Sequence, residues 1–104
     1  MNTDIVIIGA GPAGIFTALE LIRKGYKGHI TLVEKGQSVE KRHCPKAETG
    51  RCMNCKPYCH ITTGFSGAGA FSDGKLGTGT HDARIAFVLA ALIEHGAKPS
   101  IAYD

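Results

Sequence analysis

The amino-terminal third of the chain carries three apolar segments whose spacing alternates between strand and helix. Residues Ile5–Ile8 form an unbroken β-branched run that ends at Gly9, as is typical of a strand buried on both faces of a parallel sheet. Apolar residues then recur at helical spacing over Ile15–Ile22 and stop before Gly25, which suits the left-handed conformation that ends many helices. Residues 29–34 are mostly β-branched or aliphatic and predict a second strand. The pattern predicts a β-α-β unit.

A second helix is predicted near the carboxyl end of the chain. The stretch Ile85–Ile93 is almost entirely apolar and is followed by Gly96, so we expect a helix that begins at a capping Thr80 or Asp82 and is buried on most sides. A further strand is expected to begin near Ile101.

The segments between these elements predict irregular structure. Residues 35–60 bring together charged residues, prolines and all four cysteines without a sustained period, and residues 61–80 are rich in glycine. We therefore expect an α/β fold: a Rossmann-like β-α-β unit in residues 1–36, a Cys- and Gly-rich excursion in residues 37–80 and a helix in residues 81–97. Since a doubly wound sheet needs more strands than these, we interpret the chain as the amino-terminal part of a longer protein or as an obligate assembly partner.

The composition and charge of the chain argue against a nucleic-acid or membrane partner. The 104 residues are 43% hydrophobic, which is ordinary for a globular domain. The net charge of +3 is spread along the chain and only 7% of the residues are aromatic, so we expect no nucleic-acid partner. Since no apolar run approaches the length of a membrane span or of a signal-peptide core, we expect no membrane partner and a cytoplasmic location.

The turn after the first strand has the spacing of a dinucleotide-binding fingerprint. Gly9 permits the tight turn, Gly11 permits close approach of the backbone to a pyrophosphate, and Gly14 permits close packing of helix on strand. Free N–H groups and the helix dipole bind an anion there without a lysine. Glu34, twenty residues later, ends the second strand, where a carboxylate can accept hydrogen bonds from ribose hydroxyls. Both FAD and NAD carry the ADP half that this motif recognises.

The cysteines are clustered. Cys44, Cys52, Cys55 and Cys59 are separated by seven, two and three residues, and His60 follows directly. Zinc and an iron–sulfur cluster both suit four such thiolates, with His60 as a substitute ligand. A redox dithiol of Cys52 and Cys55 and four unreactive thiols are the alternatives.

The motifs resemble those of known flavoproteins. Gly-Ala-Gly-Pro-Ala-Gly near the amino terminus, followed by Val33-Glu-Lys-Gly36, resembles the glutathione-reductase-type and geranylgeranyl-reductase-type enzymes. The later segments resemble a bacterial family of FAD-dependent dehydrogenases over essentially the whole chain: Arg42-His-Cys-Pro, Cys52-Met-Asn-Cys55-Lys-Pro-Tyr-Cys59 and Gly64-Phe-Ser-Gly67-Ala-Gly69-Ala-Phe71-Ser-Asp73-Gly74-Lys75-Leu. Members of that family are several times longer, which implies that the catalytic half lies outside this chain.

The resemblance implies FAD as cofactor and an FAD/NAD(P)-binding type of fold. The residues expected to contact FAD are Gly9, Gly11, Pro12, Ala13, Gly14, Glu34, Lys35, Arg42, Gly67, Ala68 and Gly69. Lys75 is a candidate contact for a phosphate or a substrate carboxylate.

The leading functional prediction is an FAD-dependent oxidoreductase acting on a small molecule or an electron carrier, with NAD(P)H as a candidate electron donor. No catalytic residue can be named, and the segment alone is expected to be inactive. One alternative is a truncated nucleotide-binding module without turnover. The other is an element whose main role is metal binding by the cysteine cluster. The remainder of a parent chain or a second copy is the expected protein partner.

Overall fold

The computed structural model describes residues 2–71 and 81–102. These fall into two compact units that divide between residues 71 and 72. The first unit contains the strands β1 (Ile5–Ile8) and β2 (Ile30–Val33), the helix α1 (Pro12–Arg23), a 3₁₀ turn at Val39–Lys41, the single-turn helix α2 (Lys46–Thr49) and a 3₁₀ turn at Ala68–Phe71. The second unit contains α3 (Arg84–Glu94) and a 3₁₀ turn at Pro99–Ala102. No helix in the described ranges is long and apolar enough to cross a membrane.

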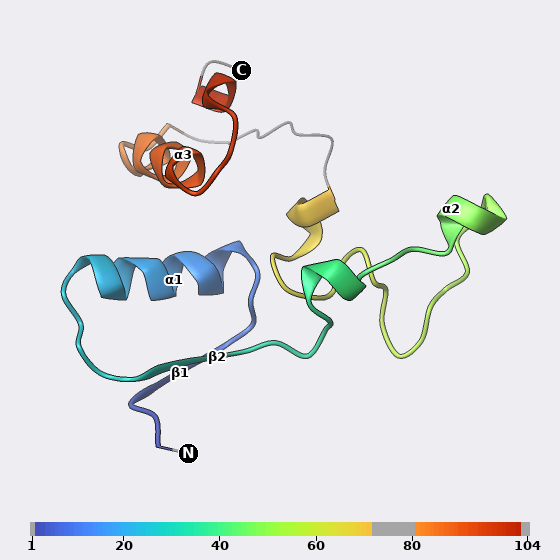
Figure 1. The fold of residues 1–104 in the computed structure, drawn as a ribbon, viewed down its shortest axis with the longest axis horizontal. Helices are drawn as coiled ribbons and strands as arrows, with labels where there is room; N and C mark the ends of the chain where they lie inside the picture. Colours follow the sequence, from blue (N-terminus) through green and yellow to red (C-terminus); the bar gives the residue numbers. More distant parts are fainter. Residues whose placement is uncertain (1, 72–80, 103–104) are drawn as a thin grey trace. The chain divides into compact units, whose positions relative to one another are not determined.

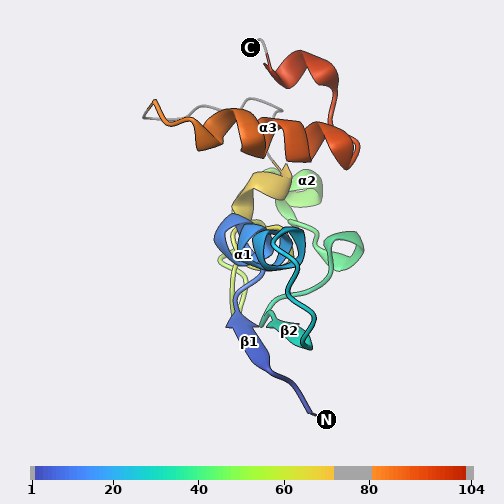
Figure 2. The ribbon, with the colours of Figure 1, turned by 90° about the vertical axis from the view of Figure 1, so that its left-hand side faces the viewer.

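The predicted β-α-β unit is confirmed. Strands β1 and β2 pair in parallel, with Ile5 opposite Ile30 and Ile8 opposite Val33. Helix α1 lies over one face of this two-stranded sheet (Figures 1 and 2). It ends in a Schellman motif, in which Tyr26 N–H donates to Leu21 O at 3.0 Å, and Gly25 has the expected positive φ of 88°. The chain thus has an α/β fold built on a partial Rossmann-like unit.

Only one face of the sheet is covered, contrary to the prediction that the first strand is buried on both faces. Ile7 faces α1, whereas Val6 is 52% exposed and Ile8 is 86% exposed on the other side. The reason is that a buried parallel strand needs helices on both faces of the sheet. The described part of the first unit supplies one.

Helix α3 forms where the sequence predicts it, but it is less buried than predicted. The N-cap position is Ala83, which makes no side-chain capping hydrogen bond, so the predicted cap Asp82 lies one residue earlier. The carboxylate of Asp82 accepts a hydrogen bond at 2.8 Å from the backbone N–H of Arg84, the first helical residue. The other predicted cap, Thr80, lies outside the described residues, as does Lys75. The predicted burial on most sides is wrong for the described chain, because no residue of α3 is buried and Phe87 is 38% exposed. Among the described residues of its unit, α3 packs against the short turn at Pro99–Ala102.

The strand expected near Ile101 is also wrong. Residues Pro99–Ala102 form a 3₁₀ turn, in which Ile101 N–H donates to Lys98 O at 3.1 Å. Pro99 favours this outcome, since its fixed φ suits the start of a helical turn and it lacks an N–H for a sheet.

Candidate functional site

The glycine turn between β1 and α1 shows a separate physical reason for each of its glycines. Gly9 has φ of +104°, which strains any residue with a side chain, and its N–H donates to Val33 O at 2.7 Å. A Cβ on Gly14 would lie 1.9 Å from Gly9 O, so only glycine lets α1 approach the turn this closely. Gly11 has no atom within 4 Å of its Cβ position. The turn is therefore packed on its helix side and open at Gly11.

The amino terminus of α1 has free hydrogen-bonding capacity. Gly11 occupies the N-cap position, which has no side-chain hydrogen bond, and no acidic residue lies in the first turn. Pro12, at the first helical position, has no N–H, and Ile15 N–H donates to Gly11 O at 3.0 Å as the helix begins. Uncapped N–H groups and the helix dipole favour an anion at this end.

Glu34 lies beside this turn. Its two carboxylate oxygens accept hydrogen bonds from Ala10 N–H at 3.0 Å and from Gly36 N–H at 2.8 Å. These two N–H groups, Ala10 first, lower the pKa of Glu34 below its usual value, and the positive charges of Lys35 and Arg42 add to the effect. The carboxylate is therefore ionised at neutral pH and is held against the glycine turn.

A second glycine-containing segment, residues 62–67, crosses the first turn. Ser66 N–H donates to Ala10 O at 2.8 Å, and Phe65 N–H donates to Gln37 O at 3.1 Å. A Cβ on Gly67 would lie 3.2 Å from the Pro12 ring, so the backbone of this segment passes directly over the start of α1. Ser66 adopts a positive φ of 76°, a conformation that is uncommon for a residue with a side chain.

The two segments border an open cavity of about 430 Å³. Its walls are formed by the ends of both strands, the glycine turn and the crossing segment: Ile8, Gly9, Gly11, Val33, Glu34, Lys35, Thr62, Thr63, Gly64 and Gly67. Five of the eleven predicted cofactor contacts line it, namely Gly9, Gly11, Glu34, Lys35 and Gly67. Pro12, Ala13 and Gly14 begin α1, and Ala68 and Gly69 lie in the following 3₁₀ turn; these five lie outside the lining. Below, this space is called the strand-end cavity.

Sequence reasoning missed Thr62 and Thr63 as lining residues. Their only signal was their position just before Gly64 and Gly67, which the sequence analysis could not place relative to the first turn. The hydrogen bond from Ser66 to Ala10 provides that placement.

Arg42 is buried, with 4% of its surface exposed, and is not among the cavity residues. Its Nε donates to His60 O at 2.8 Å, its Nη1 to Phe65 O at 2.7 Å and to Gly67 O at 2.9 Å, and its Nη2 to Ile61 O. The guanidinium also stacks on the Phe71 ring, 4.7 Å from its centroid. The geometry fits a residue that holds the crossing segment in position.

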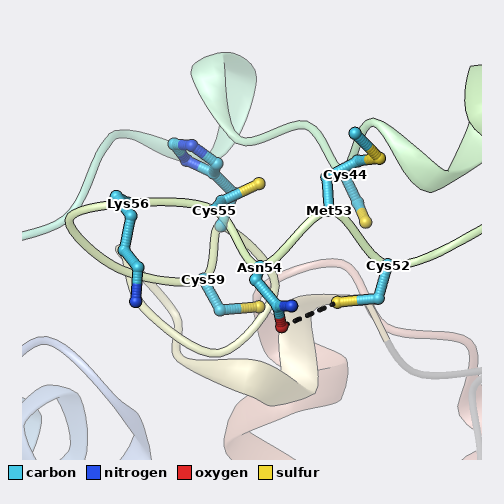
Figure 3. Close-up of a pocket in the computed structure, with 8 residues that line it drawn as sticks. Cys44, Cys52, Met53, Asn54, Cys55, Lys56 and Cys59 are labelled. Carbon is cyan, nitrogen blue, oxygen red and sulfur yellow. Dashed lines mark hydrogen bonds between the residues drawn. The ribbon is translucent and has the colours of Figure 1, made fainter.

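The cysteines line a second, separate cavity of about 200 Å³ (Figure 3). All four are free thiols and line it together with Met53, Asn54, Lys56 and His60. Figure 3 shows Cys52 and Cys59 turned toward Asn54, whose Oδ1 accepts from the Cys52 thiol at 3.8 Å. As they stand, no three His, Cys, Asp or Glu side chains in the described part of the chain are arranged to hold a metal ion. Hydrogen bonds from the backbone of Thr62 and then Ile61 lower the pKa of the Cys59 thiol.

Comparison with known proteins finds a family match for the first half of the chain. Residues 4–54, which include the glycine turn, Glu34 and Arg42, match the sequence model of the FAD dependent oxidoreductase family. No solved structure matches the chain.

Individual relatives match parts of the chain, and some of them have enzyme names. The chain is 43% identical over 99 residues to an uncharacterized protein of Clostridium beijerinckii. The matched region covers 95% of this chain and 18% of that protein. It is 57% identical over 30 residues to a ferredoxin–NADP reductase of Neorickettsia sennetsu, covering 29% of this chain and 9% of the reductase. It is 37% identical over 60 residues to a flavin-dependent halogenase of Armillaria mellea, covering 56% of this chain and 10% of the halogenase. The chain thus spans less than a fifth of each of these relatives, and the comparisons support an FAD-dependent oxidoreductase family with FAD as the cofactor.

Proposed function

We propose that this chain is the FAD-binding segment of a flavin-dependent oxidoreductase of the dehydrogenase type, and that the strand-end cavity receives the ADP moiety of FAD. The observation that carries the proposal is the meeting of Gly11 and Glu34 at the carboxyl ends of two parallel strands. In open α/β sheets, ligands bind outside the carboxyl ends of the strands.

The chemistry of the lining fits the two halves of an ADP group. The open face of Gly11 and the uncapped start of α1 suit the pyrophosphate, because backbone N–H groups and the helix dipole stabilise its negative charge. The ionised carboxylate of Glu34 suits the ribose hydroxyls as a hydrogen-bond acceptor. Lys35, at the same rim, adds a positive charge near the phosphates.

The remaining six predicted contacts form two groups and one single residue, Arg42. Pro12, Ala13 and Gly14 form the first turn of α1 and act by shaping the pyrophosphate site. Ala68 and Gly69 follow Gly67 on the crossing segment and are proposed to face FAD through their backbone. Arg42 is proposed to act as a positioning residue, since its donors are engaged by backbone carbonyls.

When bound, FAD supplies hydride or electron transfer. The proposed roles of this chain are to bind and orient the ADP end of the cofactor. We further propose NAD(P)H as the electron donor and a small molecule or an electron carrier as the second substrate, by analogy with the ferredoxin–NADP reductase relative. We assign no acid or base for that chemistry among the residues that the structure describes.

Calorimetric titration of the full chain tests the proposal. FAD and ADP should both bind at one site per chain, and ADP should compete with FAD. FMN is the matched control: it retains the isoalloxazine ring and lacks the ADP moiety, so it should not compete. Absence of binding by both FAD and ADP, or equal binding of FMN, would contradict an ADP site.

A further inference from the structure

The segment that carries the cysteines has no apolar core of its own. Apart from the single turn α2, residues 43–60, here called the cysteine loop, are irregular, and none of them is buried. Figure 1 shows this loop projecting away from the β-α-β unit. A loop of this length without buried apolar side chains needs another source of order, and small irregular segments often obtain it from a metal ion.

The side chains around the cysteine cavity form a soft donor set. The cavity is lined by every cysteine of the chain and by Met53, and no Asp or Glu is among the lining residues. Thiolates select zinc and similar thiophilic ions, whereas calcium and magnesium require oxygen ligands. The ammonium group of Lys56, also in the lining, offsets part of the negative charge that several thiolates would bring.

A second, independent observation concerns His60. Its Nδ1 is buried and lacks a hydrogen-bond partner among the described residues, and His60 lines the same cavity. A buried ring nitrogen without a partner loses its hydrogen bond to water without replacement. Coordination of a metal ion would satisfy this atom.

We propose that the cysteine cavity binds one thiophilic divalent cation of the zinc class, with four ligands drawn from Cys44, Cys52, Cys55, Cys59 and His60. The present side-chain arrangement holds no ion, so binding includes a closure of the loop that brings the donors around the metal. Ligand closure of this kind couples metal affinity to local folding. The site is structural, since it uses all four coordination positions for protein donors.

The two ends of the cysteine loop are joined by a hydrogen bond. Arg42, directly before the loop, donates through Nε to the carbonyl of His60, the last residue of the loop, at 2.8 Å. The ends of the loop are therefore already held together, and the entropy lost on metal binding is confined to the residues between them.

Titration of the reduced, metal-free full chain with Co²⁺ tests the proposal. We expect one Co²⁺ per chain, with the absorption bands of tetrahedral thiolate coordination, and its displacement by one equivalent of Zn²⁺. Thiol counting gives a second readout, because zinc should protect at least three of the four thiols from reagent. Limited proteolysis within the loop should slow on addition of zinc.

Variants identify the ligands. Cys52→Ser combined with Cys55→Ser should weaken Zn²⁺ binding by more than the roughly 10–100-fold that loss of an outer-shell partner costs. Arg51→Ala is the matched control, since Arg51 is an exposed residue of the same loop outside the cavity lining and its loss removes no donor; this variant should retain binding. Unchanged affinity in the double variant would overturn the proposal.

Three other results would also overturn it. The first is no Co²⁺ uptake by the reduced chain, and the second is iron with acid-labile sulfide in protein purified without oxygen. The third is that the thiols are protected from reagent only when they form an intramolecular disulfide, and not when zinc is added. None of these measurements involves a nucleotide. The metal site and the FAD site can therefore fail independently.

Discussion

The carboxylate of Glu34 accepts a hydrogen bond at 3.0 Å from the backbone N–H of Ala10, the buried residue between Gly9 and Gly11. This contact joins the end of β2 to the turn after β1, two segments that are 24 residues apart in the sequence. It places a negative charge at the edge of a turn that favours anions. In the ADP complex proposed above, Glu34 would therefore contact a sugar next to a phosphate instead of the phosphate itself.

Replacement of Glu34 should weaken nucleotide binding more than it weakens the fold. Glu34→Gln keeps the shape and removes the charge of the acceptor, so we expect the affinity for FAD and ADP to fall by about 10–100-fold, the value of one charge-assisted hydrogen bond. Calorimetry on both ligands measures this effect. Glu40→Gln, at an exposed position in the same unit, is the control; equal affinity in the two variants would exclude a ribose contact by Glu34.

Replacement of Gly14 by alanine should lower the stability of the chain, whereas replacement of Gly11 should lower its affinity for FAD. Gly14→Ala brings a Cβ to 1.9 Å from Gly9 O and should destabilise the chain by about 1–3 kcal/mol or more through overpacking. Gly11→Ala meets no atom within 4 Å, so its stability should stay within about 1 kcal/mol of the parent. Its methyl group should nevertheless lower FAD affinity at least about tenfold, because it occupies space needed for close approach of the pyrophosphate. Urea unfolding and calorimetry separate the two effects.

The stability of the first unit should depend on pH through Glu34. Its pKa is lowered in the folded chain, so its contribution is fully present above the unfolded value of about 4.3 and is lost as the pH falls through the lower folded pKa. Denaturant unfolding of the parent and of Glu34→Gln should show a difference at pH 6 that shrinks toward pH 3. A difference that grows on acidification would contradict the assigned direction.

Loss of Arg42 should loosen the crossing segment. Arg42→Ala removes the donors to four carbonyls and should cost about 3 kcal/mol of unfolding free energy, because buried acceptors are left without partners. Arg42→Lys should recover only part of this loss, since an ammonium lacks the planar fork. Arg51→Ala, at an exposed position in the cysteine loop, serves as the comparison. If Arg42→Ala unfolds like Arg51→Ala, the guanidinium does not hold the segment.

The sequence predicted the parts of the fold that local chemistry determines. The run Ile5–Ile8, the helical period of α1 and Gly25 at its end all reflect interactions within a few residues, and the structure confirms them. The position of Glu34 beside the glycine turn was also predictable, because the length of the β-α-β unit determines where the second strand ends.

The parts that depend on distant contacts were not predictable. The position of residues 62–67 depends on the hydrogen bond between Ser66 and Ala10, and the role of Arg42 depends on carbonyls 18 to 25 residues away. The burial of α3 failed as a prediction for a related reason. Apolar content shows that a helix favours burial, but it does not show which surface is available to cover it.

The base of the cysteine loop has a consequence for how this segment can vary. Because the cost of closing a loop grows only with the logarithm of its length, and because the Arg42 side chain holds residues 42 and 60 together, insertions or deletions between these positions should leave the glycine turn undisturbed. A change in the length or the cysteine content of this segment should therefore leave the walls of the strand-end cavity in place.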